Sequence, residues 1–197
     1  KLKETEIGMV PEDWEVVRLG SIFSITSGKT RPKMLKKTAT DPYVFPVFGG
    51  NGIIGYSNDF LLDYTTIILG RVGEYCGSVH ISHEKCWVSD NALYIKHFQK
   101  EIDITYLSHA LEILNLNGLK NTGGQPLISQ SIVYSQYIPL PPLPIQQRIA
   151  SILSAIDEKI QAEENKKKAL ENLFKSMLHN LMTAKIRVNN LELNQNV

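Results

Sequence analysis

Ile138-Pro139-Leu140-Pro141-Pro142-Leu143-Pro144 is the stretch that decides the fold of this chain. Proline holds the backbone extended and lacks the amide hydrogen that a helix interior needs, but it suits a first helical turn. From just after Pro144 to about Met182 the sequence contains no Gly and no Pro. We therefore predict one uninterrupted helix there, a rod of roughly 57 Å at about 1.5 Å per residue.

The predicted helix carries residues at alternating steps of three and four, which is the heptad pattern of a coiled coil. Glu163 and Lys167 interrupt the pattern, with four large apolar positions on either side. They form either a solvated patch or a device that sets register, in which Glu163 meets Lys167 of a second, antiparallel helix. An apolar seam of this kind needs a partner helix to cover it. The seam positions are Ile149, Leu153, Ile156, Ile160, Glu163, Lys167, Leu170, Phe174, Met177 and Leu181.

The segment before the proline stretch is rich in Gly, β-branched and aromatic residues. Runs at 65–69, 78–81 and 92–95 are bounded by turn residues and predict strands, and Asn51-Gly52 is a strong turn signal. Residues 104–117 predict a helix that Gly118 stops. We therefore predict an α+β fold. It has a mixed, β-rich globular domain (1–138), a proline joint with a single long coiled-coil helix (139–184), and a polar C-terminal tail (185–197).

The composition is that of an ordinary soluble protein, with 43% hydrophobic residues, 21% charged residues and a net charge of +1. No apolar run approaches the 18 or so residues that a membrane span needs, so we expect a cytoplasmic protein. Cys76 and Cys86 are too few for a disulfide framework, and we expect them to be reduced and buried.

Catalytic motifs are missing from this sequence. Gly70-Arg71-Val72-Gly73 lacks the lysine of a phosphate-binding loop. Asp41-Pro42-Tyr43 is similar to part of an amino-methyltransferase motif, but a second proline and a preceding glycine-rich turn are absent. His80 and His83 have no Cys or carboxylate pattern nearby that would complete a zinc site. We therefore predict that the chain is not an enzyme and holds no metal or cofactor.

A basic loop and two glycine-rich polar loops favour a binding function. The basic loop, between Gly28 and Ala39, has five cations and no acidic residue. Taken alone such a run is usually a solvated loop, but it also suits contacts with DNA phosphates. Loops 48–56 and 121–126 add Asn and Gln, whose amides can read adenine edges, and glycines that permit close approach. The five cations are Lys29, Arg31, Lys33, Lys36 and Lys37.

Seven segments, in their order along the chain, resemble the specificity subunits of type I restriction–modification systems. Three examples are Leu69-Gly70-Arg71-Val72-Gly73, Thr122-Gly123-Gly124-Gln125-Pro126 and Pro144-Ile145-Gln146-Gln147-Arg148. The seven segments are residues 6–16, 25–32, 48–56, 69–73, 122–129, 138–149 and 181–186. The resemblance implies a subunit that reads one half of a bipartite double-stranded DNA target. It also implies that the subunit scaffolds DNA methyltransferase and restriction/translocase subunits. On this resemblance S-adenosylmethionine, ATP and Mg belong to those partner subunits.

Members of that family usually carry two recognition domains and two long helices packed antiparallel, whereas this chain has one of each. The resemblance therefore implies a half-subunit, either naturally short or cut from a longer chain, that forms a homodimer through antiparallel long helices. A rod of about 57 Å spans roughly 17 base pairs at about 3.4 Å each, so two domains could read half-sites on either side of an untouched spacer.

Loop chemistry and family position together predict the DNA-binding residues. Lysines and arginines would contact phosphates or guanine edges, and the remaining residues would lie near bases. The predicted set is Lys29, Thr30, Arg31, Lys33, Asn51, Tyr56, Arg71, Thr122, Gly124 and Gln125.

Two alternatives stay open. One is a recognition-domain fragment of a DNA adenine methyltransferase, which would need a cofactor motif that the sequence lacks. The other is a coiled-coil scaffold with no role in nucleic-acid binding. Binding of S-adenosylmethionine by the chain would favour the first alternative, and a basic loop without effect on DNA binding would favour the second.

Overall fold

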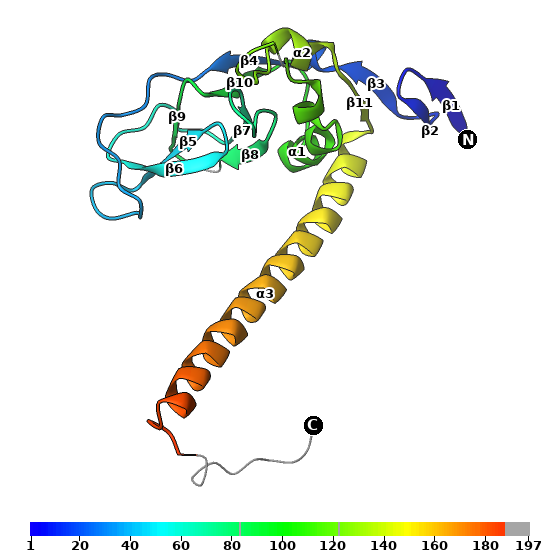
Figure 1. Ribbon diagram of the computed structural model, residues 1–197. Coiled ribbons are helices and arrows are strands. Elements are labelled where there is room, and N and C mark those ends of the chain that lie inside the picture. Colours follow the sequence, from blue (N-terminus) through cyan, green and yellow to red (C-terminus); the bar gives the residue numbers. More distant parts are fainter. Residues whose placement is uncertain (83, 122, 188–197) are drawn as a thin grey trace. The chain divides into compact units, whose positions relative to one another are not determined.

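The computed structural model describes residues 1–82, 84–121 and 123–187 (Figure 1). The chain divides into two compact units, Lys1–Ala150 and Ser151–Val197. The first unit runs 12 residues past the predicted boundary at 138, because the proline segment and the first turns of the long helix belong to it.

An antiparallel sheet forms the centre of the first unit. Its strands are β4 (Phe23–Ser27), β10 (Ala92–Phe98), β7 (Thr66–Gly70) and β8 (Val79–Ser82), in the order β4-β10-β7-β8. The three strands predicted from the apolar runs are confirmed as β7, β8 and β10. Their β-branched and aromatic side chains suit a pleated surface that is buried on at least one face.

Apolar clusters lie on both faces of this sheet. Every residue of β7 is buried, and side chains alternate between faces along a strand. Ile67 and Leu69 accordingly join the main cluster, whereas Ile68 joins a second, smaller one. β7 is therefore a central strand with a packed layer on either side.

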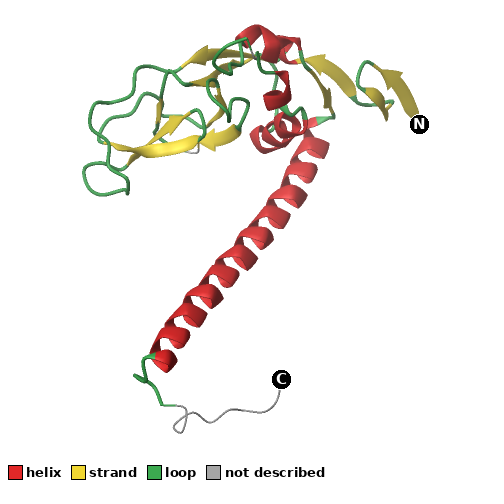
Figure 2. Ribbon diagram, viewed as in Figure 1, coloured by secondary structure: helices red, strands yellow, loops and turns green. Residues whose placement is uncertain are grey.

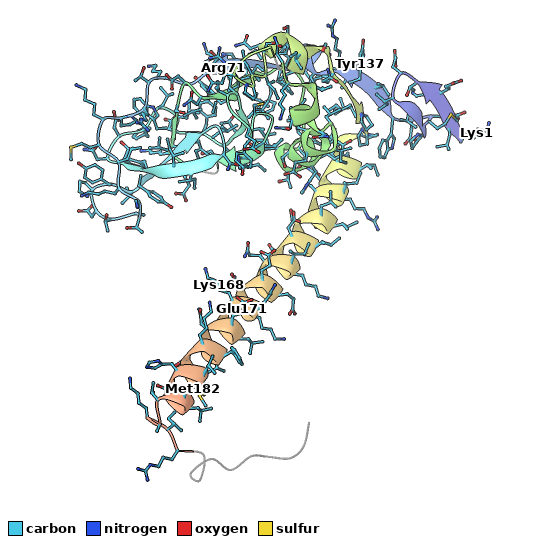
Figure 3. The ribbon with its side chains drawn as sticks, in the orientation of Figure 1. Lys1, Arg71, Tyr137, Lys168, Glu171 and Met182 are labelled. Atoms are coloured by element: carbon cyan, nitrogen blue, oxygen red, sulfur yellow. The ribbon has the colours of Figure 1, made fainter. Side chains whose placement is uncertain are left out.

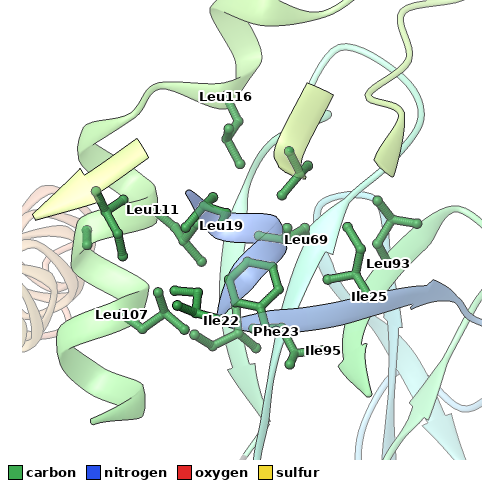
Figure 4. Close-up of a cluster of buried hydrophobic side chains, with 14 of the residues drawn as sticks. Leu19, Ile22, Phe23, Ile25, Leu69, Leu93, Ile95, Leu107, Leu111 and Leu116 are labelled. Atoms are coloured by element: carbon green, nitrogen blue, oxygen red, sulfur yellow. The ribbon is translucent and has the colours of Figure 1, made fainter. Parts of the chain in front are cut away.

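Helix α1 (Ile104–Ile113) covers the main cluster, where Leu107 and Leu111 pack with Phe23 (Figure 4). Asp103 caps the helix, because its carboxylate accepts a hydrogen bond from the Tyr106 amide at 2.8 Å. The predicted extent of this helix, to residue 117, is wrong. Asn115 adopts a left-handed conformation (φ 47°), which asparagine tolerates, so the chain leaves α1 early and continues as the short helix η2 (Leu116–Leu119).

A second layer packs on the other face of the central sheet. It is a sheet of order β6-β5-β9, made of β5 (Phe45–Gly49), β6 (Gly52–Ser57) and β9 (Trp87–Val88). Phe48 and Val88 join it to Ile68 in the smaller cluster. The predicted Asn51-Gly52 turn is confirmed: it joins β5 to β6, and Gly52 has the positive φ (+85°) that glycine adopts without strain.

The proline segment is built into the first unit. β11 (Tyr137–Leu140) pairs antiparallel with β3 (Glu15–Arg18), so Pro139 and Leu140 belong to a strand and not to the predicted joint. β11 pairs with β3 alone in its sheet, and an edge strand tolerates proline. The remaining elements of this unit are β1 (Leu2–Thr5), β2 (Gly8–Pro11), η1 (Leu19–Ser21) and α2 (Gln130–Ser135).

Gln146 anchors the first turn of the long helix. Its side chain is 2% exposed, and its Nε2 donates to Pro141 O at 2.8 Å while its Oε1 accepts from the Asp103 amide at 3.0 Å. Both ends of the buried amide are thus satisfied, and they join the helix start to the cap of α1.

Helix α3 (Leu143–Met182) is the predicted long helix, and Figure 2 shows it as one continuous element. Its 40 residues make a rod of roughly 60 Å at about 1.5 Å each. Among the described residues no helix combines the length and apolar character of a membrane span. Cys76 and Cys86 are both buried free thiols, as predicted. Most of the predicted polar tail, 188–197, lies outside the described residues.

Candidate nucleic-acid interface

The turn at residues 89–92, between β9 and β10, is where several distant segments of the first unit meet. The Ala92 amide donates to Ser89 O at 3.0 Å and closes the turn. The amides of Gly28 and Lys29, which follow β4, donate to Ala92 O and Val88 O at 3.1 and 3.0 Å. The start of the basic loop is therefore bonded to both sides of this turn.

Arg71, directly after β7, is bonded to the same turn. Its amide donates to Asn91 O at 3.0 Å, and its carbonyl accepts from the Ile128 amide at 2.9 Å. Its guanidinium is held as well, because Nη1 donates to Ser27 Oγ at 3.1 Å. A guanidinium has five N–H donors, so this bond orients the half-buried side chain (labelled in Figure 3) and leaves further donors for a ligand.

The β5–β6 turn packs closely against the end of β7. A methyl group on Gly70 would collide with Gly50 O, and one on Gly50 would lie 2.8 Å from Val72 O. Ser78 Oγ donates to Gly50 O at 3.0 Å. Only glycine permits this approach, which fixes the exposed Asn51 beside residues 70–72.

The second glycine-rich loop is joined to the same place. The Gly73 amide donates to Pro126 O at 2.9 Å, so Gly124 and Gln125 are held near the chain that follows β7. Both are exposed, and a methyl group on Gly124 would meet no heavy atom within 4 Å. Open space beside this backbone is what a ligand would need. Thr122 lies outside the described residues.

We call this cluster the loop junction and define it as residues 27–29, 49–52, 70–73, 88–92 and 124–128. It unites predicted DNA-binding residues that are up to 96 positions apart in sequence. Those that it contains are Lys29, Asn51, Arg71, Gly124 and Gln125.

Tyr56 and Asn51 belong to the same predicted loop, 48–56, but the hairpin carries Tyr56 away from the loop junction. It pairs with Pro46, five residues along β6 from Asn51, which is about 17 Å at about 3.3 Å per residue. Its amide donates to Lys36 O at 2.8 Å, and the Lys36 Nζ lies 5.7 Å from the centre of the Tyr43 ring. Tyr56 and Lys36 thus mark a second basic and aromatic region at the other end of the hairpin.

Thr30, Arg31 and Lys33 lie in the long connection between β4 and β5, just beyond the junction. All three are exposed. The 89–92 turn is absent from the predicted set, although Ser89-Asp90-Asn91 is a cluster of turn residues between two apolar runs and could have marked it.

His80 lies behind the β5–β6 turn. Its Nε2 is 3.2 Å from Ser78 Oγ, and a methyl group on Gly52 would lie 3.3 Å from its Cε1. Burial lowers the pKa of His80, and the charge of Glu112 opposes that shift in part. His83 lies outside the described residues, and within the described ranges no group of His, Cys, Asp or Glu could hold a metal ion.

The seam of α3 is mainly exposed in the second unit. Phe174 is 67% exposed, Leu170 57% and Ile156 49%. Ile149, a predicted seam position, packs instead against the main cluster of the first unit. Further exposed apolar side chains of α3 are omitted by the heptad count, among them Ile152, Leu173 and Leu178.

The polar interruption of the seam is open to solvent. The Glu163 carboxylate lies 3.8 Å from the Lys166 ammonium, and both side chains are about two-thirds exposed. Lys168, Glu171 and Met182 extend outward from the same helix (Figure 3). α3 thus combines a charged surface with an uncovered apolar stripe.

Known proteins resemble this chain over most of its length. The type I restriction enzyme MjaVIII specificity subunit of Methanocaldococcus jannaschii is 28% identical, over 88% of this chain and 43% of the relative. The EcoprrI specificity subunit of Escherichia coli is 27% identical, over 71% of this chain and 35% of the relative. The crystal structure of a type I restriction–modification S subunit from M. genitalium has the same fold, with a TM-score of 0.69 at 20% identity, over 87% of this chain and 46% of that one.

The chain spans less than half the length of these three proteins. The model of the type I restriction modification DNA specificity domain matches residues 11–172, which include the whole loop junction and most of α3. The resemblance seen in the sequence is thereby confirmed, and the chain belongs to the family of type I restriction modification DNA specificity domains.

Proposed function

We propose that this chain reads one half of a bipartite double-stranded DNA target, as a specificity component of a type I restriction–modification complex. The observation that carries this proposal is the loop junction. Backbone hydrogen bonds hold Lys29 and Arg71 at the 89–92 turn. Asn51 and Gln125 are placed beside them through their neighbours Gly50 and Pro126, so the four side chains combine positive charge with amide donors and acceptors.

The proposed contacts divide by chemistry. Lys29, Arg31 and Lys33 bind phosphates, which fixes the position of the domain on DNA without reading sequence. Arg71 reads a guanine edge, since a guanidinium can bond guanine O6 and N7 together. The exposed amides of Asn51 and Gln125 read adenine edges in the same way.

The proposed assembly is a homodimer through antiparallel α3 helices. Exposed apolar residues flank Glu163 and Lys167 on both sides, so a two-fold axis between them would bring each apolar half of one helix against the other half of its partner. The same axis would place Glu163 of each copy beside Lys167 of the other. Two identical domains require a symmetric bipartite target.

The chain itself has no catalytic role in this proposal. Methyltransferase subunits would bring S-adenosylmethionine, and restriction/translocase subunits would bring ATP and Mg, in the cytoplasm. Both kinds of subunit would assemble on this chain.

The salt dependence of DNA binding tests the proposed phosphate contacts. Alanine replaces Lys29, Arg31 and Lys33 together, in the chain assembled with its methyltransferase partner. We expect weaker binding, and a plot of log affinity against log salt that is less steep by about 0.9 for each phosphate that the variant no longer neutralises. Alanine at Lys3, Lys96 and Lys100 removes the same charge outside both the basic loop and the junction and is the matched control. Equal slopes for both triple variants would contradict the assignment.

A further inference from the structure

The backbone of the 89–92 turn bonds the other segments of the loop junction, and its side chains at positions 90 and 91 are exposed. We propose that Asp90 and Asn91, at the exposed tip of this turn, read the major-groove edges of two adjacent base pairs, with the Asn91 amide bound to adenine. The inference rests on the proposed function and adds a base-reading element to it.

The turn is rigidly supported from below. Val88, Ser89 and Ala92 are each no more than 1% exposed, so buried residues flank the tip on both sides. The Ser89 amide donates to Phe48 O at 2.9 Å, in addition to the bonds from Gly28, Lys29 and Arg71. A group that reads a base must be held in a fixed position, and this tip is held by β4, β5 and the chain after β7.

Within residues 1–82, 84–121 and 123–187, the hydrogen bonds of Asn91 come from its backbone and none from its side-chain amide. Asn115 and Ala184 are the non-glycine residues with positive φ in the described ranges, so Asn91 does not have the left-handed backbone that would call for asparagine. Its side chain is exposed, and its backbone alone bonds Arg71. The amide can therefore present its donor and its acceptor to adenine N7 and N6 together.

The negative charge of Asp90 favours a base edge over a phosphate as the part of DNA that faces the tip of the turn. Asp90 is exposed between segments that carry Lys29 and Arg71. A carboxylate repels phosphate, but it accepts a hydrogen bond from the amino group of cytosine or adenine. The cations would then bind the backbone on either side, while the tip enters the groove between them.

Selection from a duplex DNA library of random sequence tests this inference. The full chain, assembled with its methyltransferase partner, is compared with Asn91→Ala. We expect the wild-type protein to enrich a motif that contains a fixed adenine, and the variant to lose preference at that position by roughly 5- to 150-fold. Affinity for unrelated DNA and its salt dependence should not change, because the Asn91 amide binds a base and not a phosphate. Asn58→Ala, at an exposed asparagine outside the junction, is the matched control and should keep the motif.

A second variant, Asn91→Asp, guards against a local change in the turn. Aspartate keeps the size and turn preference of asparagine but removes the donor. The variant should therefore lose the preference for adenine at the same position of the motif. If both variants select the wild-type motif, the inference is wrong although the proposed function stands. If the wild-type protein enriches no motif, the proposed function fails, and the inference fails with it.

Discussion

Phe23 and Phe174 have the same side chain in two very different surroundings. Phe23, on β4, is fully buried among apolar residues of its own unit, whereas Phe174, on α3, is 67% exposed. The same contrast distinguishes the two units: the first covers most of its large apolar side chains in two clusters, and the second leaves a stripe of them uncovered.

This difference teaches what each unit needs in order to be stable. The first unit obtains its stability from its own two clusters, so it should fold without a partner. A single long helix buries almost nothing, and its apolar stripe contributes free energy only when another helix covers it.

The largest expected effect comes from truncating the buried phenylalanine. Phe23→Ala should lower the free energy of unfolding of the first unit by about 3–5 kcal/mol, because it removes a fully buried ring and leaves a cavity. Urea unfolding followed by the fluorescence of Trp14 and Trp87, both in the first unit, measures this. Phe174→Ala is the matched control and should leave that transition unchanged. If Phe23→Ala and Phe174→Ala lowered the free energy of unfolding equally, the difference between a buried and an exposed phenylalanine would be refuted.

Charges placed in the seam should affect the α3 dimer and leave the folding of the first unit unchanged. Ile156→Glu with Leu170→Glu should convert a dimer into a monomer of 22.2 kDa in light scattering, with the first unit still folded. A buried, unpaired carboxylate is too costly for an apolar interface to retain. Ala155→Glu with Ala169→Glu adds the same charges one residue earlier, outside the seam, and should preserve the dimer. A mass that stays the same in both double variants would count against the seam.

The pH dependence of unfolding compares a half-buried histidine, His80, with an exposed one, His179. Burial lowers the pKa of His80 from its ordinary value of 6.5, so the unfolded chain binds protons more readily than the folded one. The stability that His80 contributes is fully present above about pH 6.5 and is lost as the pH falls through the lower folded pKa. His80→Gln should flatten the fall in the free energy of unfolding of the first unit on acidification. His179→Gln, at an exposed position of α3, should leave it unchanged; an identical pH profile for wild type and His80→Gln would refute this role.

The smallest expected effect concerns the polar interruption of the seam. Glu163→Lys should weaken the dimer, because it would face Lys167 of the other copy, and exposed pairs contribute about 0.2–1 kcal/mol each. The double variant Glu163→Lys with Lys167→Glu restores opposite charges and should recover the dimer dissociation constant. Failure of the double variant to recover it would mean that the two-fold axis passes elsewhere.

Elements with local signals can be predicted from the sequence. α3 is predictable because nearly forty residues without Gly or Pro share one heptad pattern, and β7, β8 and β10 because each is a short apolar run between turn residues. Local sequence signals do not predict where the backbone conformation of a single residue ends a helix or permits a strand. Asn115 ends α1 early, and Pro139 is compatible with a strand because β11 lies at an edge.

The loop junction is beyond such prediction, although half of the predicted DNA-binding residues lie in it. Its backbone hydrogen bonds join Lys29 to Val88, Arg71 to Asn91 and Gly73 to Pro126, and no local sequence pattern records bonds between positions so far apart. Tyr56 shows the reverse case: it is close to Asn51 in sequence, but an extended strand separates the two.

The crowded glycines of the loop junction have a consequence for evolution. Gly50 and Gly70 fix the path of the backbone, whereas the side chains at the exposed tips of Asn51, Asn91 and Gln125 contribute little to folding. Substitutions at these tips would alter the recognised bases without disturbing the scaffold. A lineage of such chains could therefore acquire new targets through a few surface changes, while it retains the same folded domain and the same helix.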